Sequence, residues 1–213
     1  MIFIDLDNTI YNQKQILDYV FLEIGKYIEK RYDIPKNIIK EFLIKITKEK
    51  TLRYKIFDSL IEKFKLELDK KELLNLYKRK TEEYLINKKI KIYSDFEWIL
   101  KNCNNFIIYT EGDEKIQKLK INNIEKNYKI KLDLIIVKNK LSEENIEIFK
   151  YYNPKIYIGD NPYTDFYIPN KLNIFTIRIL RGLYKEIPDD IVSLEYRPKI
   201  SIRRLNKNII YEK

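Results

Sequence analysis

Two aspartates near the start of the sequence are the first residues whose type and spacing could do chemistry. Asp5 and Asp7 directly follow an apolar run at residues 2–4, and Thr9 comes two residues later. A carboxylate can bind a hard cation, attack phosphorus or exchange a proton. The chain has no histidine, so a general acid or base has to come from another residue type. Asp7 fits that need.

Three further clusters of polar residues follow apolar runs later in the sequence. They contain a threonine, two lysines and two more aspartates, which are groups that can bind a phosphoryl oxygen or a cation. The clusters are Thr110-Glu111-Gly112, then Lys138 and Lys140, and finally Gly159-Asp160 with Asp165.

Five apolar runs, each rich in β-branched or aromatic residues, predict the strands that would position these clusters. Their apolar residues are consecutive rather than alternating, which is typical of a parallel sheet covered on both faces. Helical patterns lie between the later runs, so we predict an α/β fold with a Rossmann-like parallel sheet core. The carboxyl ends of its strands would meet at one edge, where open α/β sheets bind ligands. The predicted strands are residues 2–4, 106–109, 134–137, 156–158 and 174–177.

A long insertion separates the first two predicted strands. Its apolar residues recur at helical spacing in four stretches, which predicts an all-helical domain inserted into the α/β core. We therefore expect a discontinuous core domain at residues 1–11 and 94–213 and a helical domain at residues 12–93. Ser94-Asp95-Phe96-Glu97 has the spacing of a capping box and is expected to start the helix that leads back to the core.

The chain contains only four glycines, so each is expected to mark a structural requirement. Gly25 falls inside a helical pattern, where it indicates close helix packing. Gly112, Gly159 and Gly182 come just past the ends of predicted strands. At these positions we expect a positive φ or a close approach of the backbone to another group.

The composition limits the classes of partner and compartment. Lys and Arg number 42 against 32 Asp and Glu, a net charge of +10 that favours phosphorylated or polyanionic partners. Cys103 is the only cysteine, which excludes an intrachain disulfide and favours a reducing compartment. No apolar run approaches the length of a membrane span, and no signal-peptide pattern precedes Asp5. We therefore expect a cytoplasmic location and no membrane partner.

The four polar clusters resemble the motifs of the haloacid dehalogenase-like (HAD) hydrolase superfamily and occur in the same order. The match consists of DxDxT at Asp5, Asp7 and Thr9, Thr110 as the second motif, Lys140 as the third, and GDxxxxD from Gly159 to Asp165. The helical insertion is similar to the first type of cap in that superfamily. The resemblance implies a phosphatase-type member that uses Mg²⁺ and forms an aspartyl-phosphate.

The resemblance also implies a role for each motif residue. Asp5 would be the nucleophile and Asp7 the general acid and base, with Thr110 and Lys140 completing the catalytic set. The implied metal ligands are the carboxylates of Asp5 and Asp160 and the backbone carbonyl of Asp7, with Asp165 either as a further ligand or as the residue that orients the lysine. Contacts to phosphate or substrate are expected from Thr9, Tyr11, Asn12, Thr110, Glu111 and Gly112.

Two positions depart from the superfamily pattern. Glu111 follows the second-motif threonine, where many members have Asn, and it brings a negative charge close to a phosphate site. Leu141 follows Lys140, where many members have Pro. Lys118 and Lys138 remain alternatives for the catalytic lysine.

The function that this reading favours is Mg²⁺-dependent hydrolysis of a small phosphomonoester. Asp7 argues against a dehalogenase, because the dehalogenases of the superfamily lack the second aspartate. A phosphomutase or phosphotransferase on the same fold would need the same residues and is a first alternative. A nucleic-acid-binding or interaction protein on a HAD-like scaffold is a second, supported by the net charge, the 18 tyrosines and the basic stretch at residues 197–207.

Overall fold

The computed structural model describes residues 1–49 and 55–205 of the chain. Contacts within the chain divide it into two compact units. One unit combines Met1–Gln13 with Lys89–Lys213, and the other is Lys14–Lys88. None of the described helices is both long enough and apolar enough to cross a membrane.

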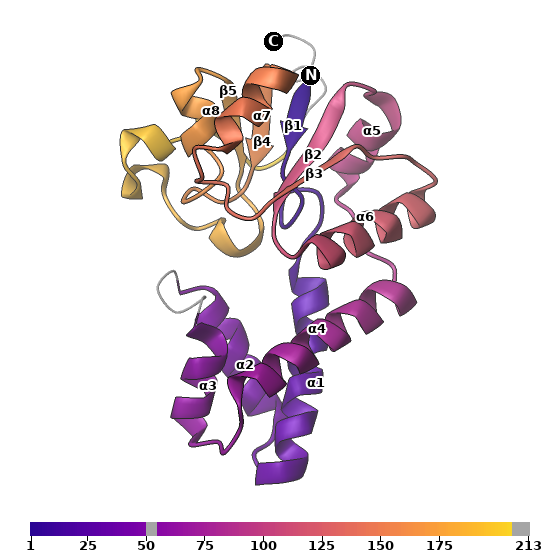
Figure 1. Cartoon of the computed structure of the whole chain (residues 1–213), viewed down its shortest axis with the longest axis vertical. Helices are drawn as coiled ribbons and strands as arrows, with labels where there is room; N and C mark the ends of the chain where they lie inside the picture. The colour runs from indigo at the N-terminus through magenta and orange to yellow at the C-terminus, as the bar shows by residue number, and fades with distance from the viewer. Residues whose placement is uncertain (50–54, 206–213) are drawn as a thin grey trace. The chain divides into compact units, whose positions relative to one another are not determined.

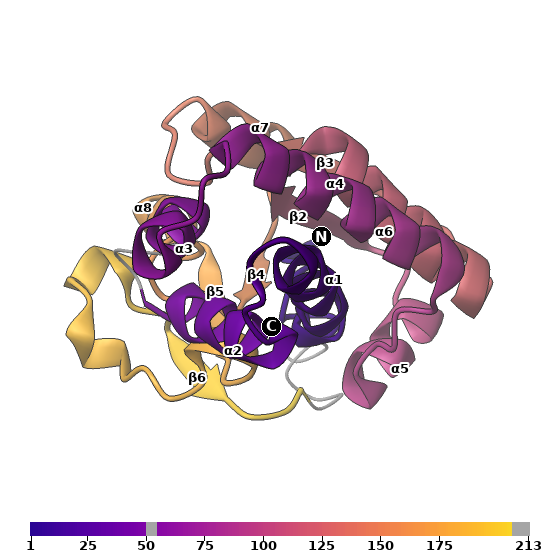
Figure 2. The ribbon, with the colours of Figure 1, turned by 90° about the horizontal axis from the view of Figure 1, so that it is seen from below.

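The first unit is built on a six-stranded parallel sheet with the order β3-β2-β1-β4-β5-β6. This confirms the predicted α/β fold with a Rossmann-like parallel core. Strands β1 to β5 are labelled in Figure 1, and β6 is labelled in Figure 2. The apolar run of β1 is buried throughout, as a central strand covered on both faces requires. The strands are β1 (Ile2–Ile4), β2 (Phe106–Glu111), β3 (Leu134–Val137), β4 (Ile156–Gly159), β5 (Phe175–Ile179) and β6 (Ile200–Ile202).

The sixth strand was not predicted. β6 has only three residues and pairs with β5 at the edge of the sheet. It lies within the stretch that the sequence indicated only as basic. Strand β2 also runs further than predicted and includes Thr110 and Glu111.

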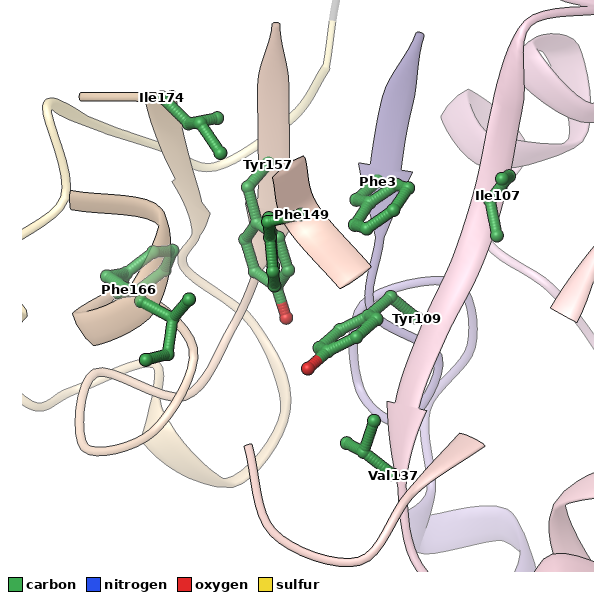
Figure 3. Close-up of a cluster of buried hydrophobic side chains, with 9 residues drawn as sticks. Phe3, Ile107, Tyr109, Val137, Phe149, Tyr157, Phe166 and Ile174 are labelled. Atoms are coloured by element: carbon green, nitrogen blue, oxygen red, sulfur yellow. The ribbon is translucent and has the colours of Figure 1, made fainter. Parts of the chain in front are cut away.

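Four helices accompany the sheet in this unit. Helices α7 and α8 cover one face, where Phe149 and Ile168 pack in a cluster with side chains from β1, β2 and β4. Figure 3 shows the aromatic centre of this cluster, in which the ring of Phe3 lies 5.5 Å from that of Tyr109 and 5.1 Å from that of Phe149. The four helices are α5 (Ser94–Asn102), α6 (Glu114–Tyr128), α7 (Asn145–Tyr152) and α8 (Tyr167–Lys171).

Helices α5 and α7 begin close to two of the motifs in the sequence. Helix α5 begins at Ser94, but Tyr93 is the residue that precedes it and no side chain caps it, so the predicted capping box is not formed. Ser94 already lies in the first turn, where its hydroxyl cannot act as the cap. Helix α7 begins at Asn145, so Lys140 is separated from it by a short turn rather than directly preceding it.

The second unit is helical, and its helices coincide with the four predicted patterns. Helices α1 and α2 lie side by side in both views (Figures 1 and 2). Gly25 of α1 makes this approach possible, because a Cβ there would lie 2.5 Å from the backbone oxygen of Lys36 in α2. The helices are α1 (Lys14–Tyr32), α2 (Lys36–Thr47), α3 (Ile56–Phe64) and α4 (Lys70–Asn87).

Candidate active site at the carboxyl edge of the sheet

The order of the central strands brings three of the predicted clusters together. Strand β1 lies between β2 and β4, with Ile4 in register with Ile108 on one side and Ile158 on the other. The chain therefore crosses to opposite sides of β1, and this reversal is the usual place of a ligand site in an open α/β sheet. Asp5 follows β1 and Asp160 follows β4.

Asp5 lies at the centre of a buried network. Its Oδ1 atom accepts a hydrogen bond from Lys140 Nζ at 2.5 Å, and its Oδ2 atom accepts one from the Thr9 hydroxyl at 3.1 Å. Oxygen atoms of Asp5, Asp160 and Asp165 all lie within 4.8 Å of one another. Such a group of carboxylates can hold a divalent cation.

Both carboxylate oxygens of Asp165 accept hydrogen bonds from other residues of the site. Its Oδ1 atom accepts from Lys140 Nζ at 2.8 Å, and its Oδ2 atom accepts the backbone N–H groups of Asp160 and Asn161 at 3.0 and 2.9 Å. Gly159 leaves room for this arrangement, because a Cβ at that position would lie 2.3 Å from Asp165 Oδ2. The geometry thus fits Asp165 as the residue that orients Lys140 and the loop after β4.

Asp160 has the least compensated carboxylate of the group. Its Oδ2 atom is buried and has no hydrogen-bond partner among residues 1–49 and 55–205. Burial, followed by the negative charges of Asp165 and Asp5, raises the pKa of Asp160 well above its usual value. A buried carboxylate oxygen without a donor fits a cation ligand. The residues present therefore fit Mg²⁺.

The same environment raises the pKa of Asp5 to about 7. Burial is the largest cause, and the charge of Lys140 opposes it without cancelling it. Lys140 itself has its pKa raised well above the usual value, since the charges of Asp165 and Asp5 outweigh the effect of its burial. The metal-free network therefore retains one charged ammonium group and an aspartate that is readily protonated.

Asp7 has its own set of donors. Lys120 Nζ lies 2.8 Å from Oδ1 and 2.6 Å from Oδ2, the Tyr11 hydroxyl donates to Oδ1, and Gln117 Nε2 lies 3.4 Å from Oδ2. Burial alone would raise the pKa of Asp7, but the charge and hydrogen bonds of Lys120 outweigh it and lower that pKa. Asp5 and Asp7 thus have opposite pKa shifts although one residue separates them.

Lys120 was not among the predicted site residues. Its signal in the sequence is a lysine on the buried stripe of α6, which contains Gln117, Lys120, Ile121 and Ile124 at helical spacing. A lysine on such a stripe requires a buried anionic partner. Of the three lysines considered as the catalytic one, Lys140 contacts the aspartates, Lys138 is exposed and Lys118 pairs with Glu114 on an exposed face of α6.

The residues that follow the second-motif threonine make contacts with the end of β3 and the segment after it. The Glu111 carboxylate accepts the backbone N–H of Lys140 at 2.8 Å, so its charge supports the lysine loop. The N–H of Gly112 donates to the Val137 carbonyl at 3.1 Å. Thr110 is buried within β2.

Tyr11 and Asn12, the two residues after the first motif that were expected to contact substrate, differ in burial. The Tyr11 side chain is buried and its hydroxyl donates to Asp7, so this ring belongs to the support of the second aspartate. Asn12 is exposed at the point where the chain leaves the first unit.

Comparisons with known proteins give a clear result for the fold. No family model and no curated protein matches the sequence. Among solved structures, a putative HAD-hydrolase from Bacillus subtilis bound to magnesium matches with a TM-score of 0.68 and 17% identity, covering 99% of this chain and 96% of that one. A predicted phosphoglycolate phosphatase from Haemophilus somnus gives 0.63 and 14% identity, covering 94% and 92%.

A third matching structure is that of an enzyme named for a different reaction. L-2-haloacid dehalogenase from Xanthobacter autotrophicus gives a TM-score of 0.61 and 12% identity, covering 95% of this chain and 94% of that one. The chain therefore has the fold of the HAD-like hydrolases, which confirms the fold that the four motifs implied. A fold shared by phosphatases and dehalogenases leaves the reaction to be argued from the residues of this chain.

Proposed function

We propose that the protein is a Mg²⁺-dependent hydrolase of small phosphomonoesters that works through an aspartyl-phosphate on Asp5. The observation that supports it best is the pairing of two differently supported carboxylates at one sheet edge. Asp5 lies against Lys140 beside the unpartnered oxygen of Asp160, while Asp7 has a separate set of donors. The second carboxylate supplies the acid and base function that a dehalogenase would lack.

The metal site would use the carboxylates of Asp5 and Asp160 together with the backbone carbonyl of Asp7. Asp165 would act through Lys140 and the loop after β4, since its oxygens are already hydrogen-bonded. When bound, Mg²⁺ would screen the charge between a phosphate dianion and the attacking carboxylate.

In the first step, a carboxylate oxygen of Asp5 attacks phosphorus, and the bond from phosphorus to the leaving oxygen breaks. Asp7 gives its proton to that oxygen. The pKa of Asp7 is low in the free chain, but a phosphate dianion beside it would raise that pKa and favour the protonated form. Lys140 would balance negative charge on the phosphoryl group during transfer.

In the second step, Asp7 takes a proton from water, and the resulting hydroxide oxygen bonds to phosphorus. The bond between phosphorus and the Asp5 oxygen then breaks, which releases inorganic phosphate and restores the carboxylate. The low pKa of Asp7 suits this base role directly. The Thr9 hydroxyl donates a hydrogen bond to Oδ2 of Asp5, and Lys140 donates to the other oxygen, Oδ1.

We assign substrate choice to the helical unit, Lys14–Lys88, acting as a cap. The chain enters this unit at Lys14, seven residues after Asp7, and returns to the core at Lys89. An inserted domain that begins so few residues after the catalytic motif is suited to exclude water and contact the leaving group. A small phosphorylated metabolite is the substrate class that such a cap would admit.

Phosphate release from an aryl phosphate and a metabolite panel, with and without Mg²⁺, tests the proposal. Wild type should require Mg²⁺, and Asp5→Asn should lose activity to background because amide nitrogen cannot replace the nucleophile. Asp190→Asn, which changes an exposed carboxylate in the same unit, is the matched control and should retain wild-type rates. Full activity in Asp5→Asn would refute the mechanism. A phosphorylated sugar product in place of free phosphate would indicate a mutase.

A further inference from the structure

We propose that Lys120 is a positioning residue that holds the Asp7 carboxylate in its working orientation and supplies positive charge on the leaving-group side of the site. This inference rests on the proposed phosphatase function and extends it to a helix that none of the four motifs includes.

The contacts of Lys120 are specific to Asp7. Its ammonium group reaches both carboxylate oxygens, at 2.8 and 2.6 Å, across 113 positions of sequence. The Lys120 side chain is 6% exposed and that of Asp7 is 20% exposed, so the pair is largely shielded from water. A lysine at this depth needs a partner, and a cation that bridges two oxygens of one carboxylate restricts its rotation.

The helix that carries Lys120 is anchored to the end of β2. Asp113 caps α6 by accepting the backbone N–H of Ile116 at 3.2 Å. One turn later, Gln117 Nε2 donates to the Glu111 carbonyl at 2.7 Å and also lies 3.4 Å from Asp7. Lys120 follows Gln117 by three residues and therefore lies on the same face of the helix. Two side chains of one anchored helix thus converge on the Asp7 carboxylate.

This arrangement separates the two carboxylates of the first motif by function. Lys140 pairs with Asp5 and Lys120 pairs with Asp7, and among residues 1–49 and 55–205 neither lysine forms an ion pair with the other aspartate of the motif. Charge that develops on the leaving oxygen would face Asp7 and its lysine, where a buried cation is worth more than one in water. Lys120 should therefore affect the turnover of esters with poor leaving groups more than substrate binding.

The test compares kcat and KM for a series of aryl phosphates that differ in the acidity of the leaving phenol. Lys120→Met should lower kcat for the poorest leaving groups by roughly 10- to 100-fold, the cost of misplacing a reacting group, and change KM by less than about 3-fold. The loss should shrink as the leaving group improves. Lys126→Met, an exposed lysine of the same helix, is the control and should match wild type.

A double-mutant cycle decides whether Lys120 acts through Asp7. In the Asp7→Asn background, Lys120→Met should cause a much smaller loss of kcat, because the group that it positions is already gone and only the effect of its charge remains. An equal loss in both backgrounds, a change confined to KM, or wild-type kinetics in Lys120→Met would each overturn the inference. If Lys120→Met does not fold, Lys120→Gln keeps a neutral donor and should give a smaller loss of the same kind. Absence of Mg²⁺-dependent activity in wild type would instead refute the proposed function.

Discussion

Replacement of Lys140 by Met should destabilise the sheet-bearing unit when no metal is bound. The Lys140 side chain is 6% exposed and contacts Asp5 at 2.5 Å and Asp165 at 2.8 Å. Its backbone N–H, which donates to Glu111, is unaffected by the substitution, so the variant removes only the ammonium group. Three carboxylates would then remain close together without a buried cation.

The size of the effect follows from the burial of this pair. Removal of one partner of a buried ion pair costs about 3 to 5 kcal/mol. Asp5 can relieve part of that cost by taking a proton, because its pKa is already raised to about 7. The loss should therefore be about 3 kcal/mol at about pH 8 and smaller at about pH 6. For a chain of this length, 3 kcal/mol corresponds to a fall in melting temperature of about 6 to 12 °C.

Urea unfolding followed by the fluorescence of Trp98 measures the loss of stability of the sheet-bearing unit. Trp98 is the only tryptophan of the chain and lies in α5 of the sheet-bearing unit. The urea concentration at the midpoint of unfolding should fall, with little change in the dependence of the unfolding free energy on urea concentration. Lys150→Met is the control, because Lys150 is 59% exposed and pairs only with Glu147, and it should cost less than about 1 kcal/mol. Equal midpoints for Lys140→Met and wild type, without metal at about pH 8, would refute the charge argument.

Three further predictions concern pH, packing and a buried arginine. Because a proton competes with a cation for Asp5, whose metal-free pKa is about 7, the rise in melting temperature caused by Mg²⁺ should be larger at about pH 8 than at about pH 6. Equal rises would contradict this coupling. Gly25→Ala should destabilise the helical unit by about 1 to 3 kcal/mol, because the added Cβ would meet the backbone of Lys36. Thermal unfolding followed by circular dichroism measures this loss. An unchanged melting curve would show that α1 and α2 can move apart without cost. Arg178 is fully buried, donates to the Asp160 carbonyl and pairs with a carboxylate of the following segment. Arg178→Met should therefore cost about 3 to 5 kcal/mol in urea unfolding, and a loss below about 1 kcal/mol would contradict its assignment as a structural cation.

The position of the candidate site could be predicted from sequence because it depends on strand ends. Consecutive apolar residues identify buried parallel strands, and the residues that follow them must gather at one edge. Asp5 and Asp160 needed no further information to be placed together. The small number of glycines also indicated where the chain is closely packed near the site. Gly159, for example, has no room for a Cβ beside Asp165.

The support of Asp7 could not be read in the same way. Lys120 lies in the middle of a helix, and its contact with Asp7 depends on how α6 is rotated and anchored against the sheet. In a chain with 42 basic residues, one buried lysine does not differ in type from the many exposed ones. Only the apolar stripe on which it lies distinguishes it.

Short elements and side-chain directions were also beyond the sequence. Strand β6 has three residues and gains its partner at the sheet edge from β5, so no local pattern of its own predicts it. Glu111 is the last residue of β2, and a charge next to a phosphate site is unfavourable only if it points there. Its carboxylate is held by the backbone of Lys140, a contact between residues 29 positions apart.

The charges of the buried network explain why this site suits a divalent cation. Four aspartate carboxylates meet at the carboxyl edge, and two buried lysines accompany them, so the lysines compensate only two of the four aspartate charges. The carboxylates are Asp5, Asp7, Asp160 and Asp165, and the lysines are Lys120 and Lys140. Arg178 does not change this balance, because its charge is paired with Asp189. Without metal, the deficit appears as the raised pKa values of Asp5 and Asp160, and protons would relieve it. An ion of charge +2 would relieve it without protonating Asp5, and this condition would link metal binding to the proposed reactivity of Asp5.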